Sequence, residues 1–205
     1  MRYENEIVGA NQEPEWEPIT PKKRKYKKRN PAHRASLLLL RDIAIAVAVL
    51  VLILQFYKPT IVFEHSMEDT LHPEDYVFLS KRAYSFGEVS FGDIVVFESK
   101  LLDERGGQKS LIKRVIGLPG DTIEVKDEAV YRNGVRLSEP YVKSGVTPGA
   151  TAMVTVPEGE FYVLGDNRQV SMDSRTSEVG FVPMDKILGK VVFRLFPLST
   201  IGTVR

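Results

Sequence analysis

The 205-residue sequence contains no cysteine and only three histidines, which narrows the chemistry open to it. Without cysteine there is no disulfide framework, no zinc–thiolate centre and no thiol nucleophile. His33, His65 and His72 show none of the spacings typical of a metal site. The net charge is only +1, so no overall field points to nucleic acid as a partner. The lack of cysteine does not by itself fix the cellular compartment.

Long apolar runs are also scarce, with one exception near the N-terminus. Apolar residues are unbroken from Ile43 to Leu54. Counted from Leu37 to Tyr57, a helix rising about 1.5 Å per residue spans roughly 30 Å, the thickness of a hydrocarbon core. Arg41 and Asp42 lie near one end, where they can pair or reach the headgroups. We therefore expect a transmembrane helix over residues 36–57.

The residues ahead of this run are polar and unevenly charged. Glutamates come first, and a block of lysines and arginines follows between positions 22 and 29. We expect residues 1–35 to form a disordered basic tail. A basic block can bind nucleic acid, but one beside an apolar run is typical of a topology signal. The positive-inside rule then places the N-terminus in the cytoplasm and residues 58–205 outside the membrane.

Two other interpretations of the apolar run were weighed. A cleaved secretory signal has a short basic start and small residues after its apolar core. Here the basic lead-in is long, and the residues from Gln55 to Pro59 make a poor cleavage site. A buried core helix is the second interpretation, but an apolar surface all round fits lipid better. We interpret the run as an uncleaved anchor.

Beyond the run the pattern is mainly β, with short candidate strands bounded by turn residues. The expected strands are Tyr76–Ser80, Asp93–Glu98, Ser110–Ile116, Thr122–Lys126, Ala129–Arg132, Val135–Leu137, Ala152–Thr155, Glu160–Leu164 and Lys190–Phe196. Asn133-Gly134 predicts a hairpin with a type I′ turn, and Leu118 to Asp121 predicts a second turn. Ser138 to Gly149 is expected to be an exposed loop. Pro183 to Leu188 is expected to make a short helical turn.

Ser66 lies a few residues beyond the expected anchor, so a nucleophile there could act on a substrate held in a bilayer. His65 is a poor base for it, because adjacent residues of an extended chain point to opposite faces. Lysine can serve as the base when burial lowers its pKa by several units from about 10.4. Lys113 lies among apolar neighbours in a candidate strand and fits this role, although most lysines keep their ammonium in water.

Four blocks of sequence occur in order between the apolar run and Pro183. They are Ser66-Met67 with Thr70-Leu71, Gly92 to Phe97, Lys113 to Asp121, and Gly165 to Arg175. Together they resemble bacterial type I signal peptidase, a membrane-anchored serine–lysine endopeptidase. Lysine at position 113 separates this form from endoplasmic-reticulum and archaeal relatives, which carry histidine there. The resemblance implies a signal-peptidase-like β-sheet catalytic domain over residues 58–205, with a small inserted β subdomain at 121–157.

The resemblance also implies roles for the matching residues. Ser66 would be the acylating nucleophile and Lys113 the general base, with Ser171 orienting the lysine amine through a hydrogen bond. The framework of the site would be supported by Arg114, Asp166, Arg168, Asp173 and Arg175. Among these, an ion pair is expected between Asp166 and Arg175.

The sequence departs from the family pattern at two positions near Ser66. Asp69 stands where proline is common, so the turn after the nucleophile loses a fixed φ. Glu64 stands where some members carry a serine or threonine whose hydroxyl helps to stabilise the oxyanion. An ionised carboxylate cannot donate a hydrogen bond. The oxyanion hole is therefore expected to rest on the Ser66 backbone N–H and a water.

The implied activity is removal of signal peptides from exported preproteins after sites of the Ala-x-Ala type, through an acyl-enzyme. The cleaved segment would add as a strand to a sheet edge, with alternate side chains entering pockets and Met67 lining the cleft. The expected partners are secretory preproteins, membrane lipid and the secretion translocon, with no cofactor, metal or nucleic acid. The expected location is the bacterial cell membrane, crossed once.

Two alternatives remain open at this stage. One is a catalytically weak or inactive membrane-tethered β-domain that binds exported proteins, which the departures at Glu64 and Asp69 favour. The presence of Ser66, Lys113 and Ser171 together favours the peptidase. The other is a self-cleaving repressor of the Ser–Lys type, but that class has an N-terminal DNA-binding domain where this chain has an apolar helix.

Overall fold

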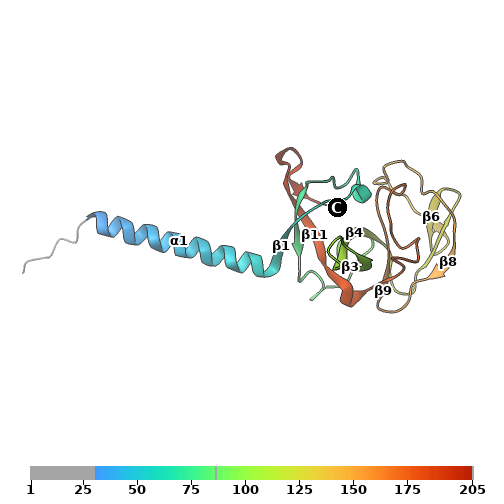
Figure 1. Ribbon diagram of the computed structural model, residues 1–205, viewed down its shortest axis with the longest axis horizontal. Coiled ribbons are helices and arrows are strands. Elements are labelled where there is room, and N and C mark those ends of the chain that lie inside the picture. The colour runs from blue at the N-terminus through green and yellow to red at the C-terminus, as the bar shows by residue number, and fades with distance from the viewer. Residues whose placement is uncertain (1–30, 86, 205) are drawn as a thin grey trace, which may run out of the picture. The chain divides into compact units, whose positions relative to one another are not determined.

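The computed structural model describes residues 31–85 and 87–204. The tail expected over residues 1–35 lies almost entirely outside the described residues. The first element is helix α1, Pro31–Phe56 (Figure 1). It begins at a proline, which suits the first turn because the N–H that proline lacks has no partner there. The part from Ala35 to Phe56 is long and apolar enough to cross a membrane, by length and composition.

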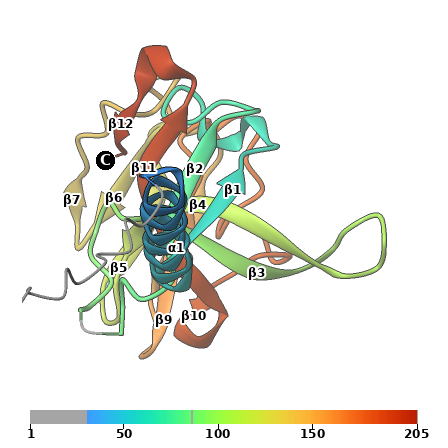
Figure 2. The ribbon, with the colours of Figure 1, turned by 90° about the vertical axis from the view of Figure 1, so that its left-hand side faces the viewer.

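The larger sheet has eight strands, and every strand pair in it is antiparallel. Its order is β1-β2-β11-β3-β4-β9-β10, and β12 pairs with β11. The strands are β1 Tyr57–Ile61, β2 Tyr76–Ser80, β3 Ile94–Leu102, β4 Gln108–Gly117, β9 Glu160–Leu164, β10 Val182–Pro183, β11 Ile187–Phe196 and β12 Gly202–Thr203. In Figure 2 the hairpin of β3 and β4 extends beyond the strands beside it.

A second sheet of four strands has the order β7-β6-β5-β8. Its strands are β5 Thr122–Lys126, β6 Ala129–Arg132, β7 Val135–Arg136 and β8 Thr151–Thr155. Asn133 and Gly134 link β6 to β7 with φ values of 54° and 77°, as a type I′ turn requires. This sheet occupies the stretch for which the inserted β subdomain was expected.

Three clusters of buried apolar side chains hold the strands together. One cluster joins the two sheets, because Ile116 and Leu164 of the larger sheet pack with Ile123, Val125 and Val130 of the smaller one. The sheets approach closely at Gly117, where a Cβ would lie 2.9 Å from side-chain atoms of both Ile123 and Val156. A side chain there would push the smaller sheet away from β4.

The mainly β fold class is confirmed, and the differences from the expected elements have local causes. β1 was not predicted because it directly follows the apolar run and contains Pro59, which breaks a strand pattern. It is an edge strand that pairs with β2, and edges tolerate proline. The helical turn expected near Pro183 is the 3₁₀ helix η2, Met184–Lys186.

The expectation of an exposed loop at Ser138 to Gly149 is wrong in part. Val142 and Thr147 are buried, with exposed fractions of 7% and 2%. Glu139 is also largely covered, because it forms an ion pair with the buried Arg168. Composition indicated a turn-rich segment correctly, but it carries no information on what the segment packs against.

Candidate active site

Ser66 lies in the short 3₁₀ helix η1, His65–Met67, which follows β1. The apolar core anchors this turn, since Met67 and Leu71 are buried in the cluster that also contains Val96. It is fixed from the side as well, because the backbone N–H of Asn167 donates to the Ser66 carbonyl oxygen at 3.0 Å. Ser66 is itself buried, with 6% of its surface exposed. The serine predicted as the nucleophile is therefore held between the core and the loop that follows β9.

Lys113 reaches the serine from β4. Its side chain is fully buried, and its Nζ donates to Ser66 Oγ at 2.8 Å and to the Ile112 carbonyl oxygen at 3.0 Å. Burial lowers the pKa of Lys113 to about 8, and this effect outweighs the opposing attraction of nearby carboxylates, first among them Glu64. The sequence placed these two side chains in one site, and the structure brings their polar atoms into hydrogen-bond contact.

Ser171 lies beside the same site but does not make the hydrogen bond expected of it. Its Oγ is buried and has no hydrogen-bond partner among the residues that the structure describes. A Cβ at Gly165 would overlap both the Ser171 side chain and the Ser66 carbonyl oxygen. Because Gly165 has no side chain, the Ser171 side chain and the Ser66 carbonyl oxygen can both lie close to its Cα.

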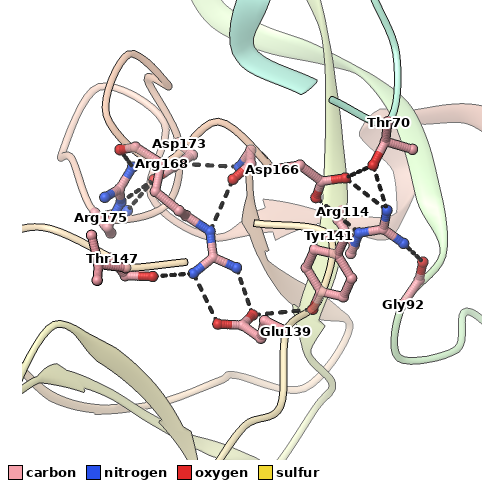
Figure 3. Close-up of polar contacts among 12 residues, drawn as sticks. Thr70, Gly92, Arg114, Glu139, Tyr141, Thr147, Asp166, Arg168, Asp173 and Arg175 are labelled. Carbon is pink, nitrogen blue, oxygen red and sulfur yellow. Dashed lines mark hydrogen bonds and ion pairs between the residues drawn. The ribbon is translucent and has the colours of Figure 1, made fainter. Parts of the chain in front are cut away.

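Arg114, which follows Lys113 in β4, forms a buried two-pronged ion pair with Asp166 (Figure 3). Nε and Nη2 of Arg114 donate to the two carboxylate oxygens at 2.9 and 2.7 Å. Thr70 donates its hydroxyl to the same carboxylate at 2.5 Å. The Arg114 guanidinium also lies over the Tyr141 ring, 4.0 Å from its centroid, where a cation is attracted by the π face.

The predicted pair between Asp166 and Arg175 is wrong. Arg175 instead holds Asp173 through Nε at 2.8 Å and Nη2 at 2.9 Å. The reason is the sheet register, because Arg114 of β4 lies opposite Leu164 of β9. That register brings the Arg114 side chain to the residues just past β9, so Asp166 is already occupied.

Arg168 is buried at the centre of a further network, also drawn in Figure 3. It donates through Nε to the Gly165 carbonyl oxygen at 2.9 Å, and its terminal nitrogens bind Glu139 and Thr147. The sequence patterns do not mark Glu139, Tyr141 or Thr147 as site residues. They lie in a segment without apolar periodicity, and only their contacts with the buried Arg114 and Arg168 reveal their part in the site.

A groove of about 600 Å³ opens in front of Ser66. Apolar side chains form much of its lining, among them Ile61, Val62, Met67, Val96 and Ile112. Met67, the residue predicted to line the substrate cleft, is part of this lining. Asp103, Glu104, Arg105 and Lys109 add charge on the side of the β3–β4 hairpin.

The two unusual residues near Ser66 both face lysines. Glu64 contacts Lys109, with 2.5 Å between Oε1 and Nζ. Asp69 is mostly exposed and lies 3.8 Å from Nζ of Lys143. His65 turns to Glu68, with 2.6 Å between Nδ1 and Oε1, and the hydrogen bonds from Lys143 and His65 lower the pKa of Glu68 to about 2. A buried serine that lines a groove and is hydrogen-bonded to a buried lysine is an arrangement suited to acyl transfer on a peptide.

Comparisons with known proteins all lead to one family. A family model described as signal peptidase, peptidase S26, matches residues 36–196. The chain is 38% identical to signal peptidase I of Bacillus licheniformis, over 79% of this chain and 89% of that protein. It is 41% identical to a probable signal peptidase I-1 of Synechocystis, over 75% and 80%. A crystal structure of a signal peptidase I from Enterococcus faecalis is 37% identical with a TM-score of 0.43, and covers 51% of this chain and 97% of that one.

Proposed function

The chain belongs to the signal peptidase family, peptidase S26, and from that premise we propose that Ser66 and Lys113 carry out its reaction. As a signal peptidase it removes signal peptides from preproteins. The observation that carries the assignment of the two residues is the 2.8 Å contact between Lys113 Nζ and Ser66 Oγ. A lysine with a pKa of about 8 is neutral in a useful fraction of molecules near neutral pH.

In the proposed reaction, neutral Lys113 takes the proton from Ser66 Oγ as the oxygen attacks the scissile carbonyl carbon. The resulting oxyanion is stabilised by the Ser66 backbone N–H. The C–N bond then breaks, the Lys113 ammonium gives its proton to the leaving amine, and an ester to Ser66 remains. Neutral Lys113 next takes a proton from water as the water oxygen attacks the ester carbonyl carbon. The C–O bond to Ser66 then breaks, the Lys113 ammonium returns the proton to Ser66 Oγ, and the carboxylic acid product leaves and ionises.

The groove supports a preference for small residues before the cut. An extended segment lying in it would direct alternate side chains to the same side. Met67 and Val96, both buried, form part of the groove lining that also contains Ser66. Two small side chains separated by one residue suit that lining, which is the Ala-x-Ala pattern.

We also propose that α1 anchors the enzyme in the bacterial membrane, with the N-terminus in the cytoplasm and residues 58–205 outside. Its apolar side chains between Leu37 and Leu54 are exposed, which suits contact with lipid. Because enzyme and preprotein are confined to one surface, they search for each other in two dimensions instead of three, and this favours their encounter. A translocon that delivers the preprotein would act at the same surface.

The test is cleavage of a secretory preprotein by the full chain in detergent. Ser66→Ala and Lys113→Ala should each lower kcat by at least about a thousandfold, as loss of a nucleophile or base does. Ser177→Ala and Lys126→Ala are matched controls, because both residues are exposed, and they should cleave normally. Full activity in either test variant would overturn the assignment. Intact preprotein that still binds the wild-type chain would support the tethered binder instead.

A further inference from the structure

The carboxylate of Glu64 lies between two amines of β4. Its Oε1 is 2.5 Å from Lys109 Nζ, and its Oε2 is 4.0 Å from Lys113 Nζ. The Lys113 side chain is fully buried, whereas 38% of Glu64 and 42% of Lys109 are exposed. Glu64 and Lys109 also line the groove that contains Ser66. The partly exposed pair of Glu64 and Lys109 therefore connects the solvent-filled groove with the buried amine of Lys113.

The other charges that face Lys113 are held differently. Asp166 and Asp173 both attract its ammonium from the loop after β9. Each is clamped by two nitrogens of a neighbouring arginine, Arg114 and Arg175 respectively. Buried bidentate pairs of this kind are fixed in geometry. Glu64 and Lys109, by contrast, are long and half-exposed, so their charges can be changed without opening the core.

We propose that Glu64 is a positioning residue for the Ser66–Lys113 pair, and that with Lys109 it governs how readily Lys113 becomes neutral. This inference rests on the proposed function. The carboxylate favours the charged form of Lys113 by attraction, and Lys109 opposes that form by repulsion. The contact between Glu64 and Lys109 sets these two influences against each other, and that of Glu64 is the larger.

The two partners are expected to act on Lys113 in opposite directions. Burial lowers the pKa of Lys113 to about 8, with Glu64 acting against this change and Lys109 adding to it. Removing the Glu64 charge therefore makes Lys113 easier to deprotonate, and removing the Lys109 charge makes it harder. Simple loss of an ion pair would affect the enzyme in the same way whichever partner were changed, so the opposite signs identify the electrostatic role.

The experiment is kcat for preprotein cleavage as a function of pH, with the full chain in detergent. Glu64→Gln should move the acid limb to lower pH by about 0.5 to 1 unit, and Lys109→Gln should move it to higher pH by a smaller amount. The limb of the double variant should lie between those of Glu64→Gln and the wild type. Glu124→Gln is the matched control, because Glu124 forms a 2.5 Å pair with Lys126 in the smaller sheet, and it should leave the limb in place.

The inference is overturned if the limb stays in place in both variants, or moves in the same direction in both. Loss of kcat or of thermal stability without movement of the limb would show a merely structural pair and would also overturn it. If the proposed function itself were wrong, the result would differ: the Lys113→Ala variant would still cleave preprotein, and its activity would still depend on pH. Added salt gives a second readout, because screening of these half-exposed charges should shrink the difference between Glu64→Gln and the wild type.

Discussion

Arg168 and Glu139 form a two-pronged ion pair in which the arginine is buried and the glutamate comes from a distant loop. The terminal nitrogens of Arg168 lie 3.0 and 2.5 Å from the two carboxylate oxygens. The loop from Ser138 to Gly149 is thereby tied to the segment that carries Asp166 and Ser171. Lys143 of the same loop contacts Glu68, just past Ser66, at 2.7 Å. The loop thus holds both sides of the site.

Glu139→Gln is expected to destabilise the protein and to lower its activity. The change leaves the buried Arg168 charge without its counter-charge, a loss that typically costs about 3–5 kcal/mol. Urea unfolding monitored by circular dichroism measures the stability, and preprotein cleavage measures kcat. Glu158→Gln is the control, because Glu158 is exposed. Equal stability of the two variants would show that the ion pair does not hold the loop.

The pairing of Arg114 with Asp166 can be tested by double-mutant cycles in unfolding experiments. Arg114→Met combined with Asp166→Asn should show a coupling energy of about 1.5–3 kcal/mol, the range for hydrogen bonds to charged groups. Arg175→Met combined with Asp173→Asn should show coupling of similar size. The cross cycle between Asp166 and Arg175 should give little coupling, and a large value there would restore the pairing expected from sequence.

Lys113→Met should abolish cleavage and at the same time stabilise the protein. The folded-state pKa of about 8 lies below the ordinary pKa of 10.5 that lysine has in an unfolded chain. Holding the buried amine therefore costs stability below pH 8. That cost fades as the pH rises from 8 to 10.5, since the unfolded chain alone still binds the proton there.

At pH 7 the expected gain for Lys113→Met is about 2 to 3 kcal/mol, and it should vanish at high pH. Thermal unfolding measured at several pH values gives the comparison. Lys126→Met, at an exposed position, should show no comparable gain. A destabilised Lys113→Met variant would mean that the hydrogen bonds of Lys113 outweigh the cost of its burial.

Gly165→Ala should lower activity strongly, because the added methyl group would overlap the Ser171 side chain and the Ser66 carbonyl oxygen. Overpacking of this kind costs about 1–3 kcal/mol and shifts the neighbouring backbone. Gly107→Ala is a suitable control, since its Cβ would meet only the flexible Asp103 side chain at 3.3 Å. The readouts are kcat and thermal unfolding, and normal kcat in Gly165→Ala would show that Ser66 does not depend on this close approach.

Sequence patterns predicted much of the scaffold. Alternating apolar residues and turn residues bound the strands well, as at Tyr76–Ser80 and Glu160–Leu164, and Asn133-Gly134 forms the hairpin turn that its residues require. The meeting of Ser66 and Lys113 was also expected, because apolar neighbours pointed to burial of the lysine and the motif order resembled a known family.

The relationships that escaped prediction are those set by register and by loop packing. The sequence does not state which residue of β9 lies opposite Arg114, so the partner of Asp166 was assigned wrongly. Glu139 and Thr147 lie in a segment whose composition indicates only turns. The contact of Glu64 with Lys109 joins the residue before η1 to a residue of β4 that is distant in the chain, and no local pattern marks it.

The strands at the two ends of the order of the larger sheet each contain one proline. β1 and β10 are its outer strands, and they carry Pro59 and Pro183. Each proline interrupts the row of amide donors that a foreign strand would need for continuous pairing. Both outer strands are therefore poor templates for aggregation with a foreign strand.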